Sequence, residues 1–200
     1  MAARPPAVHI LAGPNGAGKT TLYEAFVRRA TNAEFVNADR LSLEALGRHA
    51  LTREDAELGQ RLANERRDAL LAGRQSLVTE STFSHPSKLE LVRKAKALGY
   101  TVVVYHVNVQ TADDAVARVT AREGHGGHPV PEANIRGRYE RNPPLIREAV
   151  MLADLAHVFD NSRLGALPRR IIAFEAGKVT HVVDDLPDWA ATLYGPDVGA

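Results

Sequence analysis

The feature that most constrains this chain is a glycine-rich turn between a short apolar run and a segment of helical composition. Val8–Ala12 is apolar enough to form a buried strand, and the segment LYEAFVRRA after Thr21 reads as a helix. The residues between them, GPNGAGKT, fit the pattern G-x-x-x-x-G-K-[ST] at every fixed position. A strand before this pattern and a helix after it distinguish a phosphate-binding loop from a chance match. The sequence therefore predicts a nucleotide-binding P-loop.

Each residue type in this loop has a chemical reason. Glycines let successive backbone N–H groups approach phosphate oxygens, and the N-terminus of the following helix adds free N–H groups and the positive end of its dipole. Lys19 can reach the β- and γ-phosphates, and the Thr20 hydroxyl can ligate Mg²⁺. We therefore predict ATP and Mg²⁺ as cofactors, with Thr20 as the metal ligand. The predicted ATP-binding residues are Gly13, Pro14, Asn15, Gly16, Ala17, Gly18, Lys19, Thr20 and Thr21.

Segments of strand and helix character alternate over the first 160 residues, which favours a mostly parallel sheet with helices on both faces. The predicted core strands are 8–12, 34–37, 76–79, 101–107 and 157–161, and 170–174 with 179–183 reads as a C-terminal hairpin. We expect a single P-loop α/β domain of the kinase-like group over residues 1–200, with a five-stranded core. Residues 1–6 and 195–200 are expected to be loosely held, and Trp189 and Tyr194 to be packing residues.

Composition excludes several classes of protein. The formal net charge of +1 gives no general basic field, which argues against nucleic acid or an anionic membrane surface as a partner. The absence of cysteine excludes disulfides and thiolate metal sites and is consistent with a reducing cytosol. No apolar run reaches the length of a membrane span, and the N-terminus lacks the long apolar segment of a signal peptide. We therefore expect a cytoplasmic protein.

Polar residues follow three of the predicted strands, and ligands of parallel sheets bind at the carboxyl ends of strands. Asp39 follows the second strand, Glu80 the third, and the pair Asp160-Asn161 the fifth, so all of them could face the P-loop. Asp39 is the candidate general base, because phosphoryl transfer to a hydroxyl needs a carboxylate that accepts the proton. The alternative is a helix cap or a surface ion pair with Arg40.

The segment Glu80-Ser81-Thr82 offers one carboxylate and two hydroxyls at a strand end. Such a group suits a polyhydroxylated acceptor, and Glu80 could instead help to place Mg²⁺. The alternative is a strand-to-helix turn capped by Ser81 or Thr82.

Arginines surround a glycine-rich segment in the second half of the chain. Arg118 and Arg122 share one helix face by their spacing, and Arg136, Arg138 and Arg141 follow the segment 124–131. Arginines beside a glycine-rich loop are typical of a lid that closes over ATP and neutralises the transferring phosphate. We predict a lid over about residues 118–141; the alternative is a solvated basic helix face.

Together these motifs resemble the zeta-toxin family of P-loop kinases, including its short bacterial members often labelled predicted ABC-type ATPases. The matching stretches are LAGPNGAGKTT, FVNADR, LVTEST, RVTAREGHGGHPVPEANIRGRYERN and VFDNS, in the family's order over roughly residues 8–162. By this resemblance Lys19 and Thr20 are the phosphate and metal residues, and Asp39 takes the catalytic-base position. Arg118 or Arg122, with Arg136 or Arg138, supply the lid arginines. Glu80 and Thr82 match acceptor-binding positions, and Glu65 matches another by spacing alone.

The resemblance implies an ATP-dependent kinase for a small-molecule hydroxyl, with UDP-N-acetylglucosamine or a related UDP-sugar as the candidate acceptor. The chain is shorter than the larger toxins of the family, so we expect parts of their sugar-binding apparatus to be missing. As a toxin it would need a separate inhibitor, such as a small antitoxin protein. Two alternatives stay open: a kinase for a nucleotide, another sugar or an antibiotic, and a partner-coupled ATPase switch. The signature LSGGQ, which would favour an ABC-like ATPase, is absent from the sequence.

Overall fold

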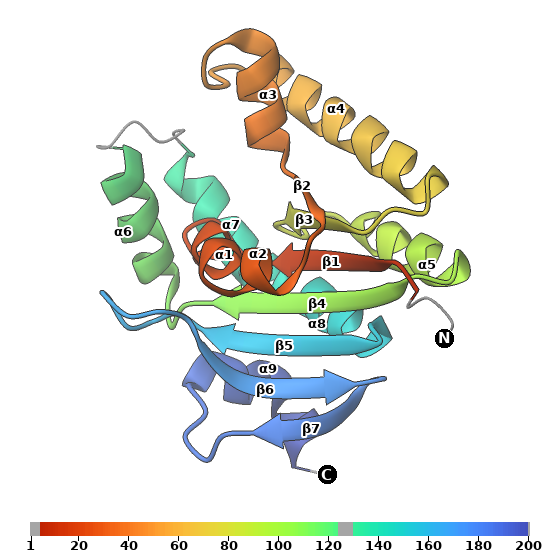
Figure 1. The fold of residues 1–200 in the computed structure, drawn as a ribbon. Coiled ribbons are helices and arrows are strands. Elements are labelled where there is room, and N and C mark those ends of the chain that lie inside the picture. The colour runs from red at the N-terminus through yellow and green to blue at the C-terminus, as the bar shows by residue number, and fades with distance from the viewer. Residues whose placement is uncertain (1–4, 124–129, 200) are drawn as a thin grey trace.

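The structure, a computed structural model, describes residues 5–123 and 130–199, and their strands form a seven-stranded sheet (Figure 1). The strand order is β2-β3-β1-β4-β5-β6-β7. The first five strands are parallel, and β6 and β7 are antiparallel to their neighbours. The predicted kinase-like α/β class is confirmed, and the C-terminal hairpin extends the same sheet. The strands are β1 Ala7–Ala12, β2 Glu34–Val36, β3 Leu77–Ser81, β4 Thr101–Asn108, β5 Leu155–Asp160, β6 Arg169–Glu175 and β7 Lys178–Val182.

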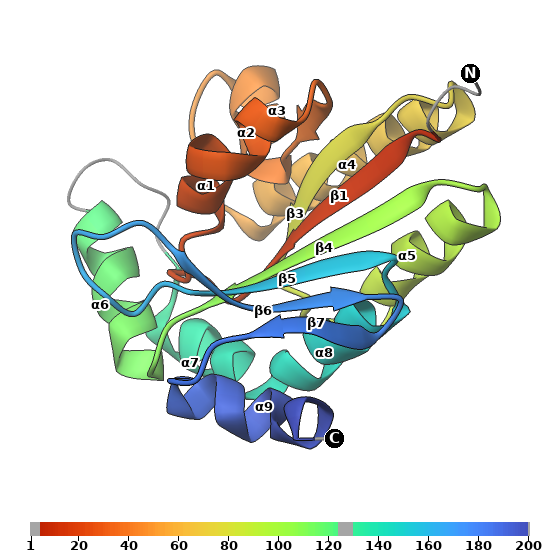
Figure 2. The same cartoon turned by 60° about the horizontal axis from the view of Figure 1, so that its bottom comes forward.

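Helices cover both faces of this sheet, which is why β1 and β4 are apolar along most of their length. On one face, Leu11 and Val107 pack against Leu22 and Val27 of the helix that follows the P-loop. That helix is continuous but changes form, as α1 Lys19–Leu22, a π-helical turn at Tyr23–Val27 and α2 Arg28–Ala30. The opposite face is covered by α5 Lys88–Ala97, α8 Pro143–Leu152 and α9 Asp188–Val198 (Figure 2).

Two helix pairs flank the carboxyl edge of the parallel strands. At one side, α3 Ala38–Leu46 follows β2 and packs against α4 Arg53–Ala72, which begins with a capping box of Thr52 and Asp55. At the other side, α6 Ala112–Glu123 packs against α7 Glu132–Arg141. The P-loop lies between these pairs (Figure 1), so side chains from both can meet a nucleotide bound there. No helix within the described parts of the chain is long and apolar enough to span a membrane.

The expectation of a loose C-terminus is wrong for residues 195–198, which continue α9. Three contacts hold this helix against the sheet. The ring Nδ1 of His106 lies 2.8 Å from the buried Tyr194 hydroxyl, and Trp189 Nε1 donates to Asp160 Oδ1 at 2.9 Å. Arg147 forms a two-fold ion pair with Asp197. Trp189 and Tyr194 are packing residues, as predicted, and their burial offsets the low helix propensity of the glycine and proline in this segment.

Candidate active site

The P-loop forms a closed turn around the side chain of its own lysine. The Lys19 ammonium is buried and donates hydrogen bonds to the carbonyl oxygens of Gly13 at 3.0 Å and Pro14 at 3.1 Å. Burial lowers the pKa of Lys19, and the negative charges of Glu80 and Asp39 oppose that shift. Two acidic side chains therefore lie close to Lys19, which the sequence predicts to bind the phosphates.

Two positions of this loop require glycine because atoms of neighbouring elements leave no space for a Cβ. A Cβ on Gly16, whose φ is +79°, would lie 2.3 Å from the Ala115 carbonyl oxygen of α6. A Cβ on Gly18, whose φ is +95°, would lie 2.2 Å from Asn161 Nδ2. The same Nδ2 donates to the Ala17 carbonyl at 2.9 Å, so Asn161 braces the loop from the end of β5. The sequence placed Asn161 near the loop and did not predict this bracing role.

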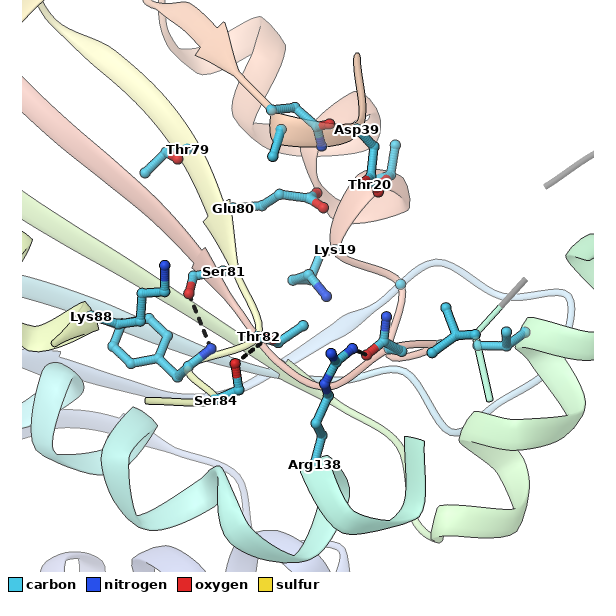
Figure 3. Close-up of a pocket in the computed structure, with 18 of the residues that line it drawn as sticks. Lys19, Thr20, Asp39, Thr79, Glu80, Ser81, Thr82, Ser84, Lys88 and Arg138 are labelled. Atoms are coloured by element: carbon cyan, nitrogen blue, oxygen red, sulfur yellow. Dashed lines mark hydrogen bonds between the residues drawn. The ribbon is translucent and has the colours of Figure 1, made fainter. Parts of the chain in front are cut away.

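A cleft of about 1860 Å³ opens beside the loop, lined by Lys19, Thr20, Asp39, Glu80 and further residues of α4, α5, α6 and α7. Figure 3 shows Lys19 and Glu80 extending into it, with Asp39 and Thr20 at its upper rim. Asp160, which the sequence also placed at this edge, is not among the lining residues. Its carboxylate accepts hydrogen bonds from Trp189 and from the Ser162 hydroxyl, because its role is to hold α9.

Asp39 is not the N-cap of α3, the role that was the alternative to a general base. Asp39 lies in the first turn of α3, and the cap of that helix is Asn37, whose side-chain oxygen accepts from the Arg40 backbone N–H at 2.9 Å. No ion pair between Asp39 and Arg40 occurs among the described residues, and the Asp39 side chain lines the cleft. Asp39 therefore presents a carboxylate to the cleft, the type of group that can accept the proton of an acceptor hydroxyl.

Glu80 lies within β3, one residue before its last residue Ser81, whereas the sequence placed it directly after the strand. Its Oε2 atom is buried and has no hydrogen-bond partner in the described structure. Burial raises the pKa of Glu80, and the Lys19 ammonium opposes that shift. A buried carboxylate oxygen without a donor, next to a phosphate-binding lysine, is suited to an additional ligand such as a hydrated cation.

The remaining predicted acceptor residues differ in their placement. Thr82 lines the cleft, and its hydroxyl donates to Ser84 Oγ at 3.4 Å. Glu65 is exposed and is not a lining residue, so the structure does not bring it to the site. The reason is helical geometry: α4 turns 100° per residue, and the cleft face of α4 carries Asn64 and Arg67 instead. Glu65 therefore lies one position away from the face of α4 that lines the cleft.

The arginines near the predicted lid resolve into different roles. Arg138 lines the cleft and donates to Asn15 of the P-loop at 2.8 Å, whereas Arg136 forms ion pairs with Asp113 and Glu132 away from the cleft. Arg118 and Arg122 both line the cleft. Arg118 donates to the Ser162 carbonyl, and the charge of Arg122 affects the pKa values of Lys19 and Glu80. The segment 124–129 of the predicted lid lies outside the described residues.

Comparison with known proteins identifies the family. Residues 8–142 match the model of the AAA_33 family, described as an AAA domain, so the chain belongs to this family of P-loop proteins. The predicted class, a P-loop phosphotransferase with a kinase-like fold, agrees with this family and fold. The comparison does not single out a UDP-N-acetylglucosamine kinase subgroup, which stays a prediction. No curated protein matches the chain.

Solved structures share the fold at low sequence identity. A chain of the AvrRxo1-ORF1:AvrRxo1-ORF2 complex superposes with a TM-score of 0.69 at 16% identity, and the match covers 96% of this chain. This chain spans 63% of the length of that protein. A candidate kinase from Chloroflexus aurantiacus superposes at 0.55 with 22% identity, over 70% of this chain and 80% of its own. The PezAT toxin-antitoxin structure of Streptococcus pneumoniae superposes at 0.59 with 12% identity, over 100% and 81%.

Proposed function

We propose that this protein transfers the γ-phosphate of ATP to a hydroxyl group of a small-molecule acceptor. The observation that carries the proposal is the convergence of Lys19, Asp39 and Glu80 on one cleft at the N-terminus of α1 (Figure 3). A P-loop alone does not separate kinases from switches or motors. A carboxylate placed opposite the phosphate-binding lysine supplies what a kinase needs in addition, a base for the acceptor hydroxyl.

The P-loop backbone and Lys19 would hold the phosphates of ATP, and the Thr20 hydroxyl would ligate Mg²⁺. The buried, unpartnered Glu80 Oε2 fits this ion, because it is an oxygen ligand without a competing hydrogen bond. When bound, the Mg²⁺ ion would neutralise part of the negative charge on the phosphates of ATP. Arg118 lies beside the loop after β5, where it contacts Ser162, and it would bind the nucleotide on that side.

In the reaction, Asp39 accepts the proton of the acceptor hydroxyl as its oxygen attacks the γ-phosphorus. The bond between the γ-phosphorus and the bridging oxygen breaks, and ADP leaves with that electron pair. Lys19, Arg122 and Arg138 stabilise the negative charge on the transferring group and the leaving oxygens. Each of these side chains lines the cleft.

The acceptor we propose first is a UDP-sugar such as UDP-N-acetylglucosamine. The support is the resemblance of the motif set to zeta toxins together with a cleft wall rich in hydroxyl groups, which include Ser81, Thr82 and Ser84. The structural neighbours include the PezAT toxin-antitoxin system and a two-protein AvrRxo1 complex. These likenesses support a cytoplasmic toxin that a small partner protein neutralises.

The proposal is tested by a mass-spectrometric acceptor screen. Purified protein, Mg²⁺ and ATP are incubated with a panel of UDP-sugars and with a cytosolic metabolite extract, and Lys19→Ala serves as the control. We expect a product heavier by one phosphoryl group that is absent with the control variant. ATP consumption without any phosphorylated small molecule, stimulated by a protein partner, would support the ATPase-switch alternative instead.

A further inference from the structure

Two basic side chains, Arg67 and Lys88, line the cleft beside β3. Arg67 comes from α4 and donates to Thr79 Oγ1 at 3.2 Å and to the side-chain oxygen of Asn64. Lys88 is the first residue of α5, and its amino group extends toward Ser81 in Figure 3. Both side chains are half-buried and line the same cleft as Lys19. Burial lowers the pKa of Lys88, and the nearby charge of Arg67 lowers it further.

These two cations lack the acidic partners that neighbouring basic residues have. Over residues 5–123 and 130–199, no carboxylate lies within ion-pair distance of Arg67 or Lys88. By contrast, Arg53 on the same cleft pairs with Glu57 at 2.7 Å, and Lys94 pairs with Asp68 at 2.6 Å. Two like charges that are partly removed from water repel each other, and an anion between them removes that cost.

We propose that Arg67 and Lys88 bind a phosphoryl group of the acceptor. A guanidinium and an ammonium converging on one region match phosphate oxygens, and the hydroxyls of Ser84 and Ser87 add donors on the same wall. The inference rests on the proposed kinase function and narrows it: the acceptor carries a phosphate or diphosphate, with its reacting hydroxyl directed to Asp39. A neutral sugar or an uncharged antibiotic would leave these two cations unpaired.

The test uses inorganic pyrophosphate as the probe and protein whose P-loop is filled with a non-hydrolysable ATP analogue and Mg²⁺. Pyrophosphate binding is measured by calorimetry for the wild type, Arg67→Met, Lys88→Met and the double variant. Arg53→Met is the matched control, because it removes one charge from the same helix and the same cleft. We expect pyrophosphate to bind the wild type and the control equally, and to bind the double variant at least about tenfold more weakly.

Two results would overturn the proposal: wild-type protein that binds no pyrophosphate once the P-loop is filled, or equal binding by the double variant. Lys88→Met preserves the hydrogen bonds of Arg67, so a loss of binding in this single variant with an unchanged melting temperature excludes a folding defect. The same calorimetry with UDP and with uridine then distinguishes a diphosphate from a base as the recognised group. Because binding is measured without turnover, a failed acceptor screen would refute the proposed function and leave this subsite standing.

Discussion

Gly59 sets the spacing between α4 and α3, the helix that carries the proposed base Asp39, and it does not contact the reacting groups itself. It lies in α4 where that helix crosses the start of α3, and a Cβ at Gly59 would lie 2.5 Å from the Ala38 carbonyl oxygen and 3.0 Å from Ser42 Cβ. Ala38 directly precedes Asp39. Ser42 is buried and donates to the Asp55 carbonyl at 3.2 Å, so the crossing leaves no space for a methyl group.

Gly59→Ala must therefore move α3 away from α4 by about 0.9 Å, which brings the 2.5 Å separation to an ordinary 3.4 Å. A displacement of about 1 Å at a reacting group costs about 100-fold in rate. We expect turnover of the acceptor found in the screen to fall by about that factor. ATP affinity should stay unchanged, because the P-loop is built on β1 and α1. The variant is measured by steady-state kinetics and by nucleotide calorimetry.

Gly73→Ala is the matched control, since Gly73 is the C-cap of the same helix and its added Cβ makes only ordinary contacts, with the Ala69 carbonyl oxygen at 3.4 Å and the Gln75 side chain at 3.8 Å. At Gly59, inside the helix, alanine favours the helix by about 1 kcal/mol, which offsets part of the cost of moving α3, so neither variant should unfold. Wild-type turnover in Gly59→Ala would show that the position of Asp39 does not limit the reaction.

Three further outcomes follow from the structure. Asn161→Ala removes the hydrogen bond to the Ala17 carbonyl, a loss of about 1.4 kcal/mol for one buried hydrogen bond. ATP binding, measured by calorimetry, should therefore weaken about tenfold. Equal affinity would contradict the bracing role. Burial lowers the pKa of the fully buried His106 to about 3, so below pH 6.5 the unfolded chain binds a proton that the folded chain does not. The free energy of unfolding should fall by about 2.3 kcal/mol for this group between pH 6.5 and 4.5, and urea titrations of the wild type and His106→Gln should differ in that slope; parallel slopes would contradict it. Thr52→Ala removes the cap of α4 and should lower the free energy of unfolding by about 1 kcal/mol in the same titrations, whereas no change would show the cap to be dispensable.

The sequence predicted those parts of the molecule that depend on local pattern. The P-loop and the alternation of strands and helices each have a signature within a few residues, and the structure has both. Asp39 and Glu80 were found because the ends of parallel strands meet at one edge. Glu65 was misplaced because spacing alone cannot fix the rotation of α4, where a single residue changes the face.

Other features depend on contacts between segments far apart in the chain. The C-terminal helix is held by Tyr194 against His106 and by Arg147 against Asp197, and no local pattern in residues 195–198 indicates a helix. A contact between distant segments also determines which of Arg136 and Arg138 reaches the P-loop. Asp113 in α6 pairs with Arg136, whereas Arg138 contacts the P-loop.

In the proposed mechanism, Asp39 serves as the base for phosphoryl transfer from ATP held by the P-loop. The most direct test is a single-turnover measurement of Asp39→Asn with the acceptor from the screen, together with ATP binding by calorimetry. Asparagine keeps the shape of the side chain and cannot accept the proton. Transfer should fall by about 10² to 10⁴-fold, with ATP affinity unchanged. Near-wild-type transfer by Asp39→Asn would contradict the account.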